Sequence, residues 1–164
     1  MNFQSQVAHA LDEEHRVNLD LLGKVEQAFA RMPRSGASQD PELARMAAGF
    51  ARHLEHDVDR HFDFEEQVLF PRLADAGEGD IAELFAEEHA AIREAARAML
   101  PLALAAAEGE LDDAGWRELK VGALEIVERQ VSHIQKETMA LLPVLEDLLD
   151  EDTDRELAFA YASG

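Results

Sequence analysis

The sequence predicts an all-α protein, an up-down-up-down four-helix bundle with a short C-terminal helical tail. Apolar residues recur at helical spacing in four long segments. The stretches between them are rich in Gly, Pro, Ser and Asp, and no segment shows the alternation that is typical of a strand. Because these connections are short compared with helices of about 30 residues, neighbouring helices should be antiparallel. We expect residues 1–150 to form the bundle and residues 151–164 to form the tail.

The first two helices are bounded by clear signals. The first should run from about residue 3 to Met32, where PRSGASQD interrupts the apolar pattern. The second should begin at Pro41, a favoured residue of the first helical turn, and end near DAGEGD.

The third and fourth helices follow the same logic. The third should start near Asp80 and end around EGELDDAG, and the fourth should run from about Trp116 to Leu149. The acidic turn DEDTD then precedes RELAFAYA, which has the composition of a short helix, and whether this tail docks on the bundle is left open.

Composition limits the partners of the protein. Its 35 acidic and 15 basic residues give a formal net charge of −20, which repels nucleic acid and anionic membrane surfaces. The chain has no cysteine, so thiolate metal sites and cysteine nucleophiles are excluded. The N-terminus does not resemble a signal peptide, and no apolar run approaches the ~18 residues of a membrane span. We therefore expect a cytoplasmic protein with no nucleic-acid or membrane partner.

Ionisable residues interrupt the apolar stripes of all four helices. A buried charge costs several kcal/mol unless it is paired or binds a metal. At a rise of ~1.5 Å per residue, the inward-facing members should all lie at one height in the bundle. They are four histidines and two glutamates: His15, His61, Glu65, His89, His133 and Glu137.

Two of these pairs repeat along the chain, as HFDFE and HIQKE, with an offset of 72 residues. Residues four apart on a helix lie ~5 to 6 Å from each other, a distance that one metal ion can bridge. Imidazole suits iron, zinc, copper and nickel, and a carboxylate can span two cations. The set therefore predicts a dinuclear centre in which His15 and His61 hold one ion, His89 and His133 hold the other, and the two glutamates bridge. Each ion would keep positions for an oxo or hydroxo bridge, water or a small exogenous molecule.

The remaining histidines have simpler interpretations. His9, His53 and His56 are expected at the surface, and an adventitious surface metal site is the alternative for His53 and His56. Asp57 either accepts a ring proton from His61 or is a solvated charge. A single buried histidine is more often a hydrogen-bonded core residue than a ligand, but six ionisable residues at one level are not easily explained as a structural polar network.

Two further features accompany the repeat. DEEH before His15 parallels AEEH before His89, and these acidic runs are expected to be solvated. Pro71 and Pro143 follow the two His/Glu arms and should kink or end their helices.

At these residues the sequence resembles the hemerythrin-like, or HHE cation-binding, family over almost the whole chain, from His15 through Pro143. The resemblance implies a four-helix bundle with a non-heme, oxo-bridged pair of iron ions, with zinc or manganese as alternatives. Members bind dioxygen, sense oxygen or iron, or act in oxidative and nitrosative stress. Oxygen-carrying members have a second histidine four residues on in the third helix and a closing aspartate in the fourth, whereas this chain has Arg93 and Glu137. This difference argues against simple reversible oxygen carriage.

Three functions are compatible with these residues. The first is a di-iron protein that binds dioxygen or a related ligand such as nitric oxide, for sensing, storage or protection. The second is an enzyme that acts on peroxide or nitric oxide, which is less favoured because no general acid, nucleophile or cofactor-binding loop is found apart from the metal and its carboxylates. The third is a bundle with a purely structural metal. The oligomeric state is left open.

Overall fold

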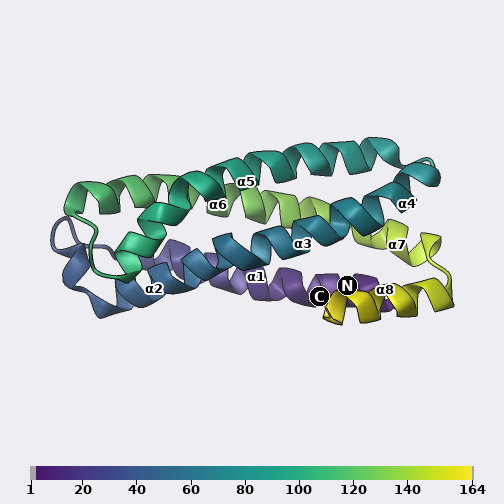
Figure 1. Cartoon of the computed structure of the whole chain (residues 1–164), viewed down its shortest axis with the longest axis horizontal. Coiled ribbons are helices and arrows are strands. Elements are labelled where there is room, and N and C mark those ends of the chain that lie inside the picture. The colour runs from purple at the N-terminus through teal and green to yellow at the C-terminus, as the bar shows by residue number, and fades with distance from the viewer. Residues whose placement is uncertain (1–2, 164) are drawn as a thin grey trace.

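The computed structural model describes residues 3–163, which are all-α and form an elongated bundle (Figure 1). The predicted all-α fold is confirmed over this range. The α-helices are α1 (Gln6–Ala30), α2 (Pro41–Arg52), α3 (Val58–Phe64), α4 (Phe70–Asp75), α5 (Gly79–Ala107), α6 (Asp113–Lys136), α7 (Leu142–Leu148) and α8 (Glu151–Ser163). A 3-10 turn, η1 (Ala37–Gln39), and three π-helical turns, η2 (His53–Asp57), η3 (Glu65–Leu69) and η4 (Glu137–Leu141), lie between them.

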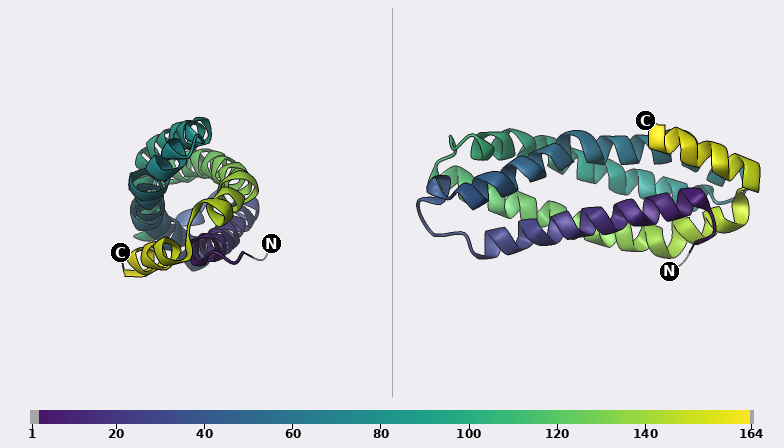
Figure 2. Two further views of the ribbon diagram at one scale, coloured as in Figure 1. Left: turned by 90° about the vertical axis from the view of Figure 1, so that its right-hand side faces the viewer. Right: turned by 90° about the horizontal axis from the view of Figure 1, so that it is seen from below.

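These elements form four long rods. The end-on view of Figure 2 shows that they surround a common axis. The rods are α1, the run from α2 to α4, α5, and the run from α6 to α7. Helix α2 packs on α5, α5 on α6, α6 on α1, and α1 on α2, so the ring of contacts is closed. The rods begin and end within a few residues of the predicted boundaries. None of the described helices has both the length and the apolar character that crossing a membrane requires.

The rods begin where the sequence offers helix caps. The side chains of Ser5 and Asp112 accept hydrogen bonds from backbone N–H groups in the first turns of α1 and α6, and Asp40 does the same ahead of Pro41. Gly77, with φ of 88°, turns the chain between α4 and α5, a conformation that costs a residue with a Cβ atom more than it costs glycine. Short polar segments of the sequence thus define the ends of the rods.

The two prolines coincide with π turns. The N–H of Phe70 bonds to the carbonyl of Glu65, five residues back, and the N–H of Leu142 bonds likewise to Glu137. Pro71 and Pro143 follow immediately, near the starts of α4 and α7. A proline lacks an N–H and crowds the carbonyl four residues earlier, and a wider turn accommodates both effects. The rods therefore continue past the prolines, and the helix widens at the two glutamates that the sequence singled out.

The bundle has an apolar core on each side of a polar layer. One core contains Phe29, Phe50 and Trp116, and the other contains Leu69 and Leu141, all of them buried. Burial of each such side chain contributes about 1.5 to 3 kcal/mol to folding. These cores fix the rods above and below the polar layer, so its side chains are held by a rigid frame.

The C-terminal helix α8 folds back along α1 (Figure 2). The buried carboxylate of Asp154 accepts hydrogen bonds from Ser5 Oγ at 2.6 Å and from the backbone N–H groups of Gln6 and Val7 at 2.7 and 3.1 Å. A negative charge at the N-terminus of a helix is stabilising. The tail therefore docks on the bundle, which answers the question that the sequence left open.

Candidate metal centre

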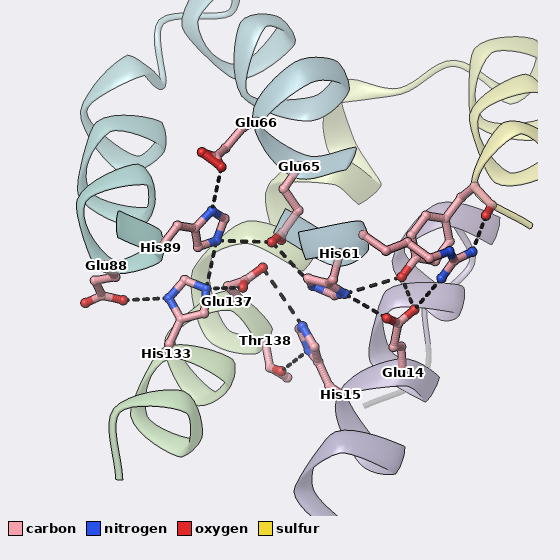
Figure 3. Close-up of polar contacts among 12 residues, drawn as sticks. Glu14, His15, His61, Glu65, Glu66, Glu88, His89, His133, Glu137 and Thr138 are labelled. Atoms are coloured by element: carbon pink, nitrogen blue, oxygen red, sulfur yellow. Dashed lines mark hydrogen bonds and ion pairs between the residues drawn. The ribbon is translucent and has the colours of Figure 1, made fainter. Parts of the chain in front are cut away.

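The structure brings the six predicted ligands together in the middle of the bundle (Figure 3). Every rod contributes at least one of them, and none is more than 4% exposed. They come from α1 (His15), α3 (His61), η3 (Glu65), α5 (His89), α6 (His133) and η4 (Glu137).

One group of ligand atoms is formed by Glu65, His89, His133 and Glu137, whose candidate atoms all lie within 4.8 Å of one another. Nε2 of His89 is 3.2 Å from Glu65 Oε1 and 3.0 Å from Nε2 of His133. His133 Nε2 in turn contacts a carboxylate oxygen of Glu137. Two imidazole nitrogens that face each other this closely have the arrangement of two ligands around one cation.

A second group is formed by His15, His61 and Glu137, again within 4.8 Å of one another. Nε2 of His15 is 3.9 Å from Glu137 Oε2, and Nε2 of His61 is 3.3 Å from Glu65 Oε1. Both glutamates thus lie between the two histidine pairs.

The hydrogen bonding of these groups fits a bound cation. Both carboxylate oxygens of Glu65 and of Glu137, and Nε2 of His15, are buried without a hydrogen-bond partner among the described residues. A buried polar group left in this state costs about 1 to 3 kcal/mol. A cation would satisfy all of these atoms, and a set of imidazole nitrogens and carboxylate oxygens suits iron, zinc or manganese.

Each histidine has a polar side chain beside its other ring nitrogen, Nδ1 (Figure 3), although Nδ1 of His89 makes no hydrogen bond with a described residue. Histidines that bind a metal usually hold their second nitrogen in this way, which fixes the ring and directs Nε2 at the metal. The Nδ1 contacts are His61 to Glu14 at 3.3 Å, His133 to Glu88 at 2.7 Å, His89 to Glu66 at 3.4 Å and His15 to Thr138 at 3.2 Å.

These outer contacts repeat with the two halves of the chain. Glu14 and Glu88 each stand directly before an inward-facing histidine in sequence, and each contacts the histidine of the next rod in the repeat. Lys136 also contacts Glu88 at 2.5 Å. Burial raises the pKa of Glu88, but Lys136 and His133 lower it more, so this carboxyl is ionised near neutral pH. The expectation that these acidic runs are merely solvated was wrong for both residues.

The pKa values of the predicted ligands are shifted in different directions. Burial and the facing Glu137 raise the pKa of Glu65 well above its usual range. For Glu137, burial acts in the same direction, but the neighbouring carboxyl group of Glu65 and the charge of His133 outweigh it and leave the pKa of Glu137 well below its usual range. Burial lowers the pKa of His15 to about 4. For His61, burial is outweighed by Glu65 and Glu14, so its pKa is raised.

His53 is not at the surface, contrary to expectation. It is 1% exposed and lies in the π turn η2, where its Nε2 is 3.0 Å from Oε1 of Gln130. Asp57 is 3.5 Å from Nδ1 of His53 and so pairs with that residue, whereas the outer partners of His61 are elsewhere. His9 and His56 are exposed, as expected.

Two residues that sequence reasoning had not placed cover the outside of the centre. The ring of Phe62 stacks on His89, with centroids 3.7 Å apart and planes 5° apart. Arg93, four residues after His89, is held by ion pairs to Asp59, Asp63 and Glu66 at 3.2, 2.7 and 2.6 Å. Arg93 thus ties down the carboxylate that holds His89. Its place in the helix was visible in the sequence, but its partners were not.

The comparisons with known proteins agree with this geometry. The family model of the Hemerythrin HHE cation binding domain matches residues 6–145. No curated protein matches the chain. The matched range contains all six predicted ligands and ends before α8.

Proposed function

The chain belongs to the hemerythrin HHE cation-binding family, and we propose that its buried cluster holds a pair of iron ions that binds dioxygen or a related small ligand such as nitric oxide. In this arrangement His15 and His61 hold one ion, His89 and His133 hold the other, and the two glutamates bridge them. The observation that carries the proposal is the position of Glu65 and Glu137, whose unpartnered oxygens lie between two histidine pairs.

The ligand count leaves room for an exogenous molecule. Two histidines and two bridging carboxylates give each ion about four protein ligands, fewer than the six of an octahedral site. When bound, iron supplies the open position and the change of oxidation state that binding of dioxygen requires. A closed site in which the protein filled every position would support a structural role instead.

The protein residues orient the ligands and exclude water. Glu14, Glu66, Glu88 and Thr138 fix the rings from outside, so each Nε2 faces the centre without rearrangement. The stacked ring of Phe62 keeps solvent from His89, and the apolar cores close both ends of the layer. Arg93 is engaged by three carboxylates, which excludes it as a metal ligand at the position where oxygen carriers have a histidine.

The first experiment is elemental analysis of the freshly purified protein together with an optical spectrum before and after dithionite. Two irons per chain, with a band that is lost on reduction and returns in air, is the expected result. Turnover of peroxide or nitric oxide by the same preparation would move the assignment to an enzyme. One zinc ion, or iron that does not respond to reductant, oxygen or nitric oxide, would support a structural metal and overturn the proposal.

A matched pair of variants distinguishes loss of a predicted metal ligand from a general effect of a substitution in α6 and η4. Glu137→Ala removes a bridging carboxylate and should abolish loading of the pair. Glu125→Ala removes an exposed carboxylate of the same rod that pairs with Arg129, and this variant should load normally. Equal loading of the two variants would contradict the bridging role.

A further inference from the structure

The ring of His89 stands between an inner and an outer carboxylate (Figure 3). Its Nε2 is 3.2 Å from Oε1 of Glu65, and its Nδ1 is 3.4 Å from Oε2 of Glu66. Glu65 and Glu66 are neighbours in sequence, but Glu65 is fully buried at the centre, whereas Glu66 is partly exposed. One imidazole therefore connects the metal centre with a carboxylate that solvent can reach.

This side of the centre differs from the other three. The histidines of those sides each form a hydrogen bond through Nδ1, with Thr138, Tyr161 and Glu88 as the partners. Nδ1 of His89 is buried and has no hydrogen-bond partner among the described residues. A buried polar atom in this state is costly. A cation bound beside Glu66 would give this nitrogen a partner.

Glu66 belongs to a cluster of three carboxylates around Arg93. Asp59, Asp63 and Glu66 follow one another at intervals of four and three residues, so they share one face of their rod. The guanidinium of Arg93 lies 3.2, 2.7 and 2.6 Å from them. Three carboxylates and one guanidinium leave a formal charge of −2, which one divalent cation neutralises. Carboxylate oxygens together with an imidazole nitrogen are suitable ligands for such a cation.

A surface hollow of about 200 Å³ lies beside the cluster, between α5 and the run from η2 to α3, and Asp59 and Arg93 both line it. Its volume is several times the ~30 Å³ that a water molecule occupies in the liquid, so a cation can arrive with part of its water shell. The guanidinium of Arg93 also lies over the ring of Phe62, which stacks on His89. Movement of Arg93 into the hollow would therefore free Glu66, next to Nδ1 of His89.

We propose that Asp59, Asp63 and Glu66 form an entry site that binds a divalent cation before it passes to the buried centre, and that Arg93 closes this site. The arriving cation displaces the guanidinium from Glu66 and takes Nδ1 of His89 as a further ligand. Arg93 pairs with Glu66 again once the cation has moved inward. This inference rests on the proposed dinuclear centre, which is the destination of the cation.

The first test follows the rate at which the metal-free protein takes up Co²⁺, whose visible absorption reports binding to the centre in stopped-flow measurements. The double variant Asp59→Asn, Asp63→Asn removes two exposed carboxylates that contact no predicted ligand. Uptake should be about tenfold slower, because local negative charge raises the association rate of a cation. The final content of two Co²⁺ per chain and their affinity should not change.

The matched control is the double variant Asp20→Asn, Glu125→Gln. It makes the same change in net charge at two exposed carboxylates that pair with basic residues elsewhere, Lys24 and Arg129. This control should take up Co²⁺ at the wild-type rate, which excludes a general effect of net charge.

The second test removes the closing residue. Arg93→Ala leaves three carboxylates without their cation, so the purified variant should retain a third Co²⁺ per chain in elemental analysis. Arg97→Ala, one turn later on α5 and in the same hollow, should retain two. Thermal melting shows whether each variant is folded. If Arg93→Ala does not fold, Arg93→Lys keeps the charge but cannot pair with three carboxylates at once, and it should take up Co²⁺ faster than wild type.

The outcomes distinguish this inference from the proposed function. If the wild-type protein binds no pair of Co²⁺ ions, the centre fails and the entry site fails with it. If the pair binds but the Asp59, Asp63 variant takes up Co²⁺ at the wild-type rate, the centre stands and the entry site is overturned. A parallel loss of uptake rate and final Co²⁺ content would assign these carboxylates to the frame of the centre, and a content of two in folded Arg93→Ala would show that the cluster binds no cation. Either result would overturn the inference.

Discussion

The hydroxyl group of Tyr161 lies 3.3 Å from Nδ1 of His61, although the two residues are 100 positions apart in the chain. The same hydroxyl donates a hydrogen bond to Glu14, and the guanidinium of Arg60 lies over the tyrosine ring at 4.5 Å. Tyr161 belongs to α8, beyond the residues that match the family domain. One of the predicted ligands, His61, is therefore contacted by Tyr161, a residue that lies outside the range matched by the family domain.

Removal of this hydroxyl should weaken the centre. Tyr161→Phe leaves Glu14 without one of its hydrogen bonds, so the carboxylate holds His61 less firmly. Loss of such an outer partner typically costs ~10-fold or more in metal affinity. Competition with a chelator, followed through the metal content of the protein, measures the change. Phe159→Ala, on the same helix with a side chain 74% exposed, is the control. Unchanged affinity in Tyr161→Phe would show that α8 only covers the centre.

Metal affinity should fall as the pH is lowered. In the metal-free protein the pKa values of His61, His133 and Glu65 are raised, so these groups hold protons that a cation must displace. Burial and the neighbouring Glu137 raise the pKa of Glu65. For His61 and His133, burial lowers the pKa, but the nearby carboxylates raise it more. More protons in solution oppose their release, so the sign of the effect is weaker binding at lower pH. His15, with a pKa of about 4, adds to this only in more acidic solution.

Calorimetry of metal binding in two buffers with different ionisation enthalpies measures the released protons directly. We expect net proton release at neutral pH and affinity that declines steadily below pH ~6. Binding without proton release would contradict the protonation of His61 and His133.

Much of the fold follows from the sequence because the signals are local. Four apolar stripes, capping residues such as Ser5 and Asp112, and glycine-containing connections each act within a few residues. The inward positions of the six proposed ligands were predictable for the same reason, since each lies on a stripe with 3.6-residue periodicity.

The parts that were missed depend on irregular helix or on distant contacts. His53 stands eight residues before His61, which in a regular α-helix turns it roughly 80° away from that ligand. The π turn η2 has a wider turn and changes this phase, so the ring is directed inward. Tyr161 reaches Glu14 because α8 packs beside α1, and both side chains then extend to His61 on α3. No periodic pattern in the sequence indicates which neighbouring helix a long side chain will reach.

Stability and metal binding should be separable. Phe29 is fully buried in the core near the far end of α1, 14 residues and therefore about 21 Å along the helix from His15. Phe29→Ala should lower the free energy of unfolding by about 3 to 5 kcal/mol. Denaturant titration measures this loss, and elemental analysis of the folded variant should show the same metal content as wild type. A parallel loss of metal at a temperature where the variant is folded would mean that the frame and the centre are coupled.

Glutamine variants of the two glutamates should differ in the metal-free protein and agree in the loaded one. The raised pKa of Glu65 means that its carboxyl already carries a proton without metal, so Glu65→Gln should leave the melting temperature of the metal-free protein nearly unchanged. Glu137 is ionised beside His133, so Glu137→Gln removes one of the two carboxylates that contact this buried histidine and should destabilise the metal-free protein. Both variants should lose the stabilisation that metal gives wild type, about 2.7 kcal/mol at a free metal concentration one hundred times Kd. Thermal melts of each variant with and without metal give the four melting temperatures.

Equal destabilisation of the two metal-free variants would contradict the unequal protonation of Glu65 and Glu137. If metal still raised the melting temperature of either variant, the role of that glutamate as a bridge would be contradicted.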